Sequence, residues 1–192
     1  MGFKPKDDVK EPKLSTHIKD VLKRSLGSEL NVHDDEIYRT KHKIMQLLTS
    51  NQDLLSCIRA TDIGASDLDN GDLYRDKYIF DYLRLPDLKS EVKNYVCFEV
   101  NDSISSYDSR VTRTITFRVV SYKGETPTDW GISRQDLMAL IVKDIFDWNG
   151  DFGLTLVKTR DYGQVTADDY YYREIVYTTT PPSNLHKKMN GR

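Results

Sequence analysis

The sequence predicts an α+β fold, in which a mixed or antiparallel sheet of about four strands is packed by helices. The clearest evidence is Arg110–Tyr122, where apolar residues alternate with threonines at the period of a strand. A second stretch, Ser133–Trp148, carries apolar residues at helical spacing. A third, Tyr170–Thr179, is rich in tyrosine and β-branched residues. In this order they predict a β-β-α-β-β core.

Two helices are expected before this core. The first begins near Asp34, where three acidic residues suit the positive end of the helix dipole. Ser50-Asn51 marks a break, after which Asp53–Arg59 is expected to add one or two further helical turns. Both stretches place apolar residues at helical spacing, namely Ile37, Ile44, Leu47, Leu48, Leu55 and Ile58. They therefore predict an amphipathic helical layer for the sheet.

The remaining elements follow from the same patterns. Ser133 is a suitable N-cap for the later helix, with Asp136 three residues on. Its predicted buried stripe is Leu137, Leu140, Ile141, Ile145 and Trp148, widened by Met138 and Val142. The other expected segments are a loop over Ala60–Tyr78, a short extended or helical piece over Ile79–Leu85, a strand over Glu91–Val100, a hairpin loop over Asn101–Ser109, a strand over Gly153–Lys158 and a polar loop over Thr159–Asp169.

These elements divide the chain into three parts. Residues 1–33 form a charged arm with one short helix over Leu14–Leu26, residues 34–182 form the α+β domain, and residues 183–192 are a basic tail. The net charge of −2 gives no prior for a basic nucleic-acid-binding surface. The N-terminus lacks a signal peptide and no apolar run approaches the roughly 20 residues of a membrane helix, so we expect an intracellular protein without a membrane partner.

The sequence nominates no catalytic, cofactor-binding or metal-binding residue. The two cysteines, Cys57 and Cys97, are far apart and outside any CxxC pair, so we expect reduced core thiols. No HExxH, GxSxG or P-loop motif is present. The acidic run from Asp67 fails as an EF-hand, because positions six and twelve hold Asp72 and Tyr78. We therefore expect no enzyme activity and no cofactor.

Large aromatic residues are the best candidates for subunit contacts. Trp130, in the loop Glu125–Ile132, is either a lid packed on the core or an exposed interface anchor, and its size favours the lid. The strand Tyr170–Thr179 is apolar on both faces, which is typical of a sandwiched strand. Its residues Tyr171 and Tyr177 are therefore interface candidates.

The order of elements resembles that of the tail terminator and neck (head–tail connector) proteins of tailed bacteriophages. The resemblance lies in helix starts, linkers and strand order over about Asp34–Leu185. It is carried by HKIMQLLTSNQDLL (His42–Leu55), DYLRLPDLKSEVKNYVCFEV (Asp81–Val100), TITFRVVSYKG (Thr114–Gly124), GISRQDLMALIVKDIFDW (Gly131–Trp148) and YYYREIVYTTTPPSNL (Tyr170–Leu185).

The resemblance implies a structural virion protein that forms a ring, usually a hexamer, at the head–tail junction. Such a ring ends the tail tube, meets the head-side connector and lets DNA pass, and it is assembled in the host cytoplasm. We expect the DNA channel to be lined by acidic residues, either Asp67, Asp69 and Asp72 or Asp168 and Asp169. The alternative is a small α+β enzyme or nucleic-acid-binding accessory protein whose site is invisible in the sequence.

Overall fold

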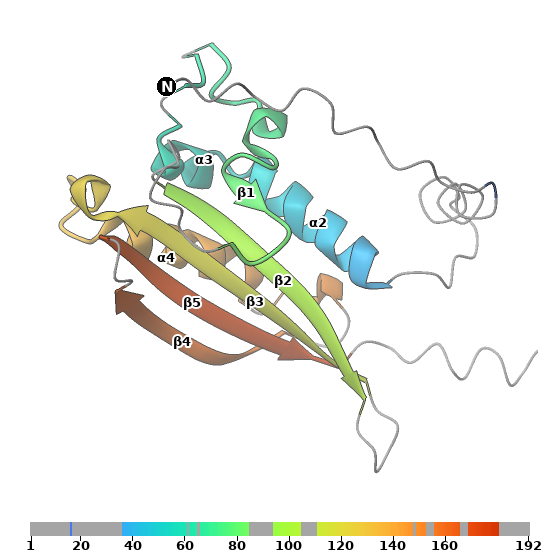
Figure 1. Cartoon of the computed structure of the whole chain (residues 1–192). Helices are drawn as coiled ribbons and strands as arrows, with labels where there is room; N and C mark the ends of the chain where they lie inside the picture. Colours follow the sequence, from blue (N-terminus) through green and yellow to red (C-terminus); the bar gives the residue numbers. More distant parts are fainter. Residues whose placement is uncertain are drawn as a thin grey trace, which may run out of the picture. The chain divides into compact units, whose positions relative to one another are not determined.

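A computed structural model describes residues 16, 36–60, 62–64, 66–84, 94–104, 111–147, 149–152, 156–165 and 169–180. The chain divides into two units, Met1–Glu36 and Ile37–Arg192, and the fold below is that of the second (Figure 1). The predicted basic tail and, apart from Thr16, the predicted arm and short helix lie outside the described residues.

Five strands form one mixed sheet in the order β1-β2-β3-β5-β4. The strands are β1 (Ile79–Phe80), β2 (Asn94–Ile104), β3 (Val111–Tyr122), β4 (Val157–Val165) and β5 (Tyr170–Thr179). Only β1 is parallel to its neighbour, and the other pairs are antiparallel. Phe117 is central, opposite Phe98 on one side and Ile175 on the other. The predicted α+β class and the strands around β3 and β5 are confirmed.

Among the described residues, three α-helices accompany the sheet: α2 (Glu36–Ser50), α3 (Gln52–Ile58) and α4 (Arg134–Phe146). Short 3₁₀ turns occupy η1 (Gly71–Tyr74), η2 (Lys123–Glu125) and η3 (Gly150–Phe152). The predicted break between the first two helices is confirmed, because the side chain of Asn51 accepts a hydrogen bond from the Leu54 N–H at 2.9 Å and caps α3. The predicted N-cap Ser133 likewise accepts from the Asp136 N–H at 3.4 Å.

The helices cover one face of the sheet, and the main core lies between the two layers (Figure 1). Phe117 packs against Phe146 of α4 with ring centroids 4.5 Å apart. Ile44 and Leu48 of α2 are fully buried in the same core. The alternating apolar residues of β3 therefore predict the correct inner face.

The opposite face of the sheet carries a smaller apolar cluster and an ion pair. The cluster consists of Phe80, Tyr95, Cys97, Val120 and Tyr170. Beside it, Arg118 of β3 contacts Glu174 of β5 at 2.7 Å. Both faces of the strand β5 are therefore partly buried, as its sequence predicts. Aromatic residues of the same chain cover its outer face.

Two predicted loops are strands in part, so these boundaries are wrong. The strand β2 continues through Ile104, into the predicted hairpin loop, and β4 occupies Val157–Val165, most of the predicted polar loop. The sequence KTRDYGQ within β4 shows no apolar alternation because this edge strand is exposed or half-exposed throughout. Its backbone bonds to β5, rather than burial, define it. Similarly, β1 is set by pairing with β2.

The predicted buried stripe of α4 is confirmed only in part: Ile141 and Ile145 pack against the core, and Trp148 lies outside the described residues. The helix buries Arg134, Met138, Ala139, Val142 and Phe146. Leu140, which belongs to the predicted stripe, is 53% exposed. Apolar residues surround most of the helix, so their spacing leaves the inward direction undetermined, and packing on β3 and β5 selects it. Part of the predicted stripe consequently faces outward.

Candidate functional site

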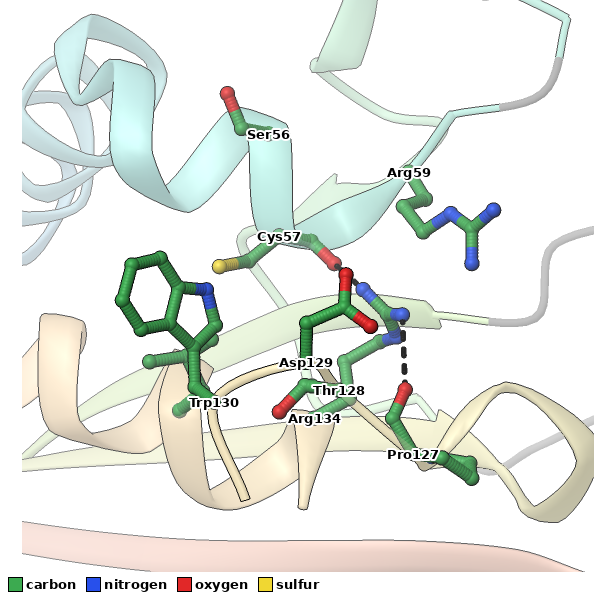
Figure 2. A pocket seen from close by; sticks show the side chains of 9 residues that line it. Ser56, Cys57, Arg59, Pro127, Thr128, Asp129, Trp130 and Arg134 are labelled. Atoms are coloured by element: carbon green, nitrogen blue, oxygen red, sulfur yellow. Dashed lines mark hydrogen bonds between the residues drawn. The ribbon is translucent and has the colours of Figure 1, made fainter. Parts of the chain in front are cut away.

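A pocket lined by described residues, here called the larger pocket, lies where α3 meets the loop between η2 and α4. Its volume is about 340 Å³, within the usual range for small-molecule sites. Figure 2 shows the lining side chains converging from three segments of the chain. They are Ser56, Cys57, Arg59, Pro127, Thr128, Asp129, Trp130, Arg134 and Leu137.

Arg134 fastens the wall of this pocket. It is 6% exposed, and its guanidinium donates a hydrogen bond to the carbonyl oxygen of Glu125 at 2.6 Å. It also donates to the carbonyl oxygens of Cys57 at 2.9 Å and Pro127 at 3.4 Å (Figure 2). Burial lowers the pKa of Arg134, and the nearby positive charge of Arg59 lowers it further. Because its donors are directed at backbone carbonyls, Arg134 joins α3 to the loop and is a poor candidate for binding an anion.

Cys57 offers a thiol to the same pocket. Burial raises its pKa, and the positive charge of Arg134 opposes that rise without cancelling it. A thiol with a raised pKa is protonated near neutral pH, whereas nucleophilic cysteines have a lowered pKa. His42, which lies in α2 and stacks on Tyr38, does not line the pocket. The arrangement therefore lacks the activated thiolate of a cysteine enzyme.

Trp130 is the most exposed large apolar side chain among the described residues, at 81%. It lies in a tight turn, in which the Thr128 hydroxyl donates to the Ile132 carbonyl and Gly131 has a φ of +73°. The interpretation of Trp130 as a lid on the core is wrong. Arg134 holds this loop in place, so the loop does not need a buried tryptophan as its anchor.

The other predicted interface residues differ in accessibility. Tyr171 is half-buried and lines a second pocket beside β4. Tyr177 is fully buried in the main core and donates a hydrogen bond to Asp147 at 2.6 Å. Its side chain is therefore not available on the surface of this chain.

The predicted channel aspartates lie in two separate turns. Asp67, Asp69 and Asp72 are exposed, next to the start of α3, where Gln52 donates to the Asp69 carbonyl at 3.2 Å. Asp169 is exposed and lies 3.4 Å from Lys123 of η2. Asp168 is outside the described residues. No hydrogen bond or ion pair links the two turns in the part of the chain that the structure describes.

The second pocket is smaller, about 170 Å³, and lies between α4 and the end of β4. It was not predicted, because β4 reads as a loop in the sequence. Its lining residues are Gln135, Asp136, Gly163, Gln164, Val165, Tyr171, Tyr172 and Arg173. Arg173 contacts Asp136 at 2.8 Å and Asp161 at 2.6 Å, so these charges are paired within the chain.

Metal and membrane sites receive no support from the described residues. They contain no group of three or more His, Cys, Asp and Glu side chains that could hold a metal ion. Among the helices described, none combines the length and the apolar character needed to span a bilayer.

Comparison with known proteins identifies the family. The model of the YomW family matches residues 43–179, from within α2 to the end of β5. The chain belongs to the YomW family, which is phage-derived. It is therefore a phage-related protein.

Two further comparisons are weaker. No curated protein matches the chain. Among solved structures, it is similar to a chain from the virion of a native gene transfer agent particle, with 13% sequence identity over 68% of this chain and 93% of that chain. The TM-score is 0.36, and a likeness at this level does not establish a shared fold.

Proposed function

We propose that the chain is a structural virion protein that forms a ring at the head–tail junction of a tailed phage. In this proposal the ring ends the tail tube, joins it to the head-side connector and lets DNA pass through its lumen. Membership of a phage-derived family is the observation that carries it. Apart from the two-residue strand β1, the element order of the described unit is two helices followed by β-β-α-β-β, which agrees with the resemblance to tail terminator and neck proteins.

The surface of the chain supports an assembly role. The edge strand β4 pairs only with β5 among the described strands, and an exposed edge is a template for pairing with another chain. Trp130 at 81% and Leu140 at 53% exposure place apolar area on the outside near α4. Exposed apolar surface of this kind is typical of protein–protein contacts.

The chemistry of the larger pocket favours assembly over catalysis. Its thiol has a raised pKa and its buried guanidinium is engaged by three carbonyl groups. A general base paired with a nucleophile, which a hydrolase or transferase site requires, is not found among the residues that line it.

Deletion of the gene from the phage or prophage that carries it tests the proposal. We expect filled heads and separate tails, seen by negative-stain electron microscopy, together with loss of infectivity. Supplying the chain in trans with a terminal tag should restore joined particles and place the tag at the neck. Normal joined particles without the gene, or a tag located on the capsid surface or tail tip, would overturn the proposal.

The proposed acidic channel is tested separately in the same particles. Asp67, Asp69 and Asp72 are changed together to lysine, which reverses the charge of one turn while leaving the core untouched. If this turn faces the DNA, the variant particles assemble normally but eject DNA more slowly, because lysine attracts the phosphate backbone. Unchanged infectivity and ejection rate would exclude this turn as channel lining.

A further inference from the structure

Two features flank the first turns of α4 and differ in shape. On the α3 side, the exposed Trp130 stands beside the larger pocket. On the β4 side lies the second pocket, which we call the Gly163 pocket after the glycine that opens it. One is a projecting side chain and the other a cavity, and they belong to the same end of the same helix.

Trp130 is presented as a rigid projection. Ile132, two residues further along the same loop, is 40% exposed. Arg134 anchors the base of the loop through three hydrogen bonds, as Figure 2 shows in part. Because the base of this loop is already anchored, binding has to order mainly the indole itself, and buried tryptophans are frequent hot spots of interfaces.

The Gly163 pocket has the size of a single side chain. Its volume of about 170 Å³ is below the usual range for small-molecule sites. A Cβ added at Gly163 would come no closer than 3.8 Å to another heavy atom, the Tyr172 carbonyl oxygen, which is an ordinary van der Waals distance, so a side chain can be added there without a clash at its Cβ. Val165, at the rim, is 67% exposed.

The lining of the Gly163 pocket suits an aromatic guest with a hydrogen-bond donor. Tyr171 supplies ring surface, whereas the ring of Tyr172 packs against the cluster on the other face of the sheet. The side-chain oxygen of Gln135 is buried and has no hydrogen-bond partner among the described residues. An acceptor left without a donor is unfavourable, and rotation of the carboxamide presents it to a donor in the pocket. Asp136 and Arg173 neutralise each other, which leaves little attraction for a charged guest.

We propose that the Trp130 indole of one copy inserts into the Gly163 pocket of a second copy, in a head-to-tail contact. The indole is a large ring whose N–H is a donor only, which matches the Tyr171 ring and the Gln135 oxygen. Because projection and pocket are different surfaces, each copy uses one toward each neighbour. Contacts of this kind form a ring when the rotation closes. The inference deepens the proposed function and rests on it for the ring.

Two single variants of the full chain separate projection from pocket. Trp130→Ala removes the projection and keeps the pocket, whereas Gly163→Leu fills the pocket and keeps the projection. We expect each to weaken self-association at least about 30-fold, the effect of losing an interface hot spot of about 2 kcal/mol. The measurement is native mass spectrometry and light scattering over a concentration series. Leu68→Ala, which shortens a residue of 41% exposure on neither surface, is the matched control.

Mixing the two variants tests the head-to-tail arrangement directly. Each variant alone should remain monomeric, but an equimolar mixture should form a one-to-one dimer, since the intact projection of Gly163→Leu meets the intact pocket of Trp130→Ala. Growth should stop at the dimer because the remaining surfaces are both damaged. A Trp130–Trp130 contact would instead let Gly163→Leu dimerise alone, and that result would overturn the inference.

Further outcomes separate this inference from the proposed function. A wild-type chain that stays monomeric at about 1 mM, or variants that assemble like the wild type, overturns the contact. If the tagged chain still forms a neck ring in particles carrying either variant, the contact fails and the ring function stands. If the mixed dimer forms but the tag is absent from the neck, the ring function fails and the contact stands. Circular dichroism melting checks that both variants are folded.

Discussion

The two faces of the sheet are built in different ways. On the helix-covered face, Phe117 and Ile175 pack into a continuous apolar core with α2, α3 and α4. On the other face, Arg118 and Glu174 form a close pair beside a small aromatic cluster. The first face is stabilised mainly by removal of apolar area from water. The second depends on hydrogen bonds and charge, so the two faces should respond differently to truncation, to added volume and to pH.

The largest expected difference in stability is between truncations of two adjacent residues of β3 that lie on opposite faces of the sheet. Phe117→Ala should lower the free energy of unfolding by about 3–5 kcal/mol, because the side chain is fully buried among Phe98, Phe146 and Tyr177. Thr116→Ala, on the half-buried outer face, should cost at most about 1 kcal/mol. Urea denaturation of both variants measures the contrast. Equal losses would show that the outer face is packed as tightly as the inner one.

Adding a methyl group should have different effects on stability at two glycines. A Cβ at Gly71 would lie 1.9 Å from the Thr49 carbonyl oxygen, so Gly71→Ala must displace η1 from the end of α2. We expect a loss of about 1–3 kcal/mol, as for other overpacked sites. At Gly163 the nearest heavy atom would be 3.8 Å away, and Gly163→Ala should be neutral or slightly stabilising, since glycine weakens a strand. Thermal melting of the two variants decides whether η1 is closely docked.

Acid should weaken the outer face through Glu174. Burial alone raises the pKa of this carboxyl group, but hydrogen bonds from Arg118 and Tyr162 and the charge of Arg118 outweigh it, so the pKa lies below its ordinary value of 4.5. Because its pKa is lower in the folded protein, the ionised carboxylate stabilises the folded state at pH values above the ordinary pKa. This stabilisation is lost as the pH falls through the lowered pKa.

Glu174→Gln isolates this contribution. The variant should be less stable than the wild type at pH 7 by about 1–3 kcal/mol, because it leaves the half-buried Arg118 without its charged partner. The difference in free energy of unfolding between the two proteins should become smaller as the pH falls below 4.5. Chemical denaturation between pH 7 and pH 3 measures this difference. Asp161 also has a lowered pKa, but it contributes equally to both proteins and therefore cancels in the comparison. A gap that is constant with pH would argue against the ion pair.

The smallest expected effect is a difference in the reactivity of the two thiols. Cys97 lies in the outer cluster at 0% exposure, and burial raises its pKa to about 11. Cys57 is half-buried and lines the larger pocket. A maleimide at pH 7.5 should therefore label Cys57 in the native protein, and Cys97 only as fast as the chain opens. Mass spectrometry of the wild type and Cys57→Ser follows both reactions. Rapid native labelling of Cys97 would mean that the outer cluster is open.

Much of the fold follows from local patterns in the sequence. The alternation in β3 assigns its inner face, and Asn51 and Ser133 mark two helix starts through their capping side chains. The aspartates of the acidic run, Asp67, Asp69 and Asp72, are likewise exposed as their composition suggests. These features depend on neighbours in the chain, so a linear sequence contains the information that sets them.

The candidate surfaces depended on contacts between distant residues. The spacing of apolar residues in α4 allowed more than one buried face, and packing on β3 and β5 turned Leu140 outward. Arg134 reached carbonyl groups in α3 and the loop, so Trp130 was left exposed although its size suggested burial. The strand β4 was defined by backbone bonds to β5, and with it came the Gly163 pocket. The sequence by itself determined the α+β class, the inner face of β3 and the helix starts, because these depend on local spacing. Only the tertiary structure decided which side of α4 faces outward and where the pockets lie, because these depend on which elements compete for the same buried area.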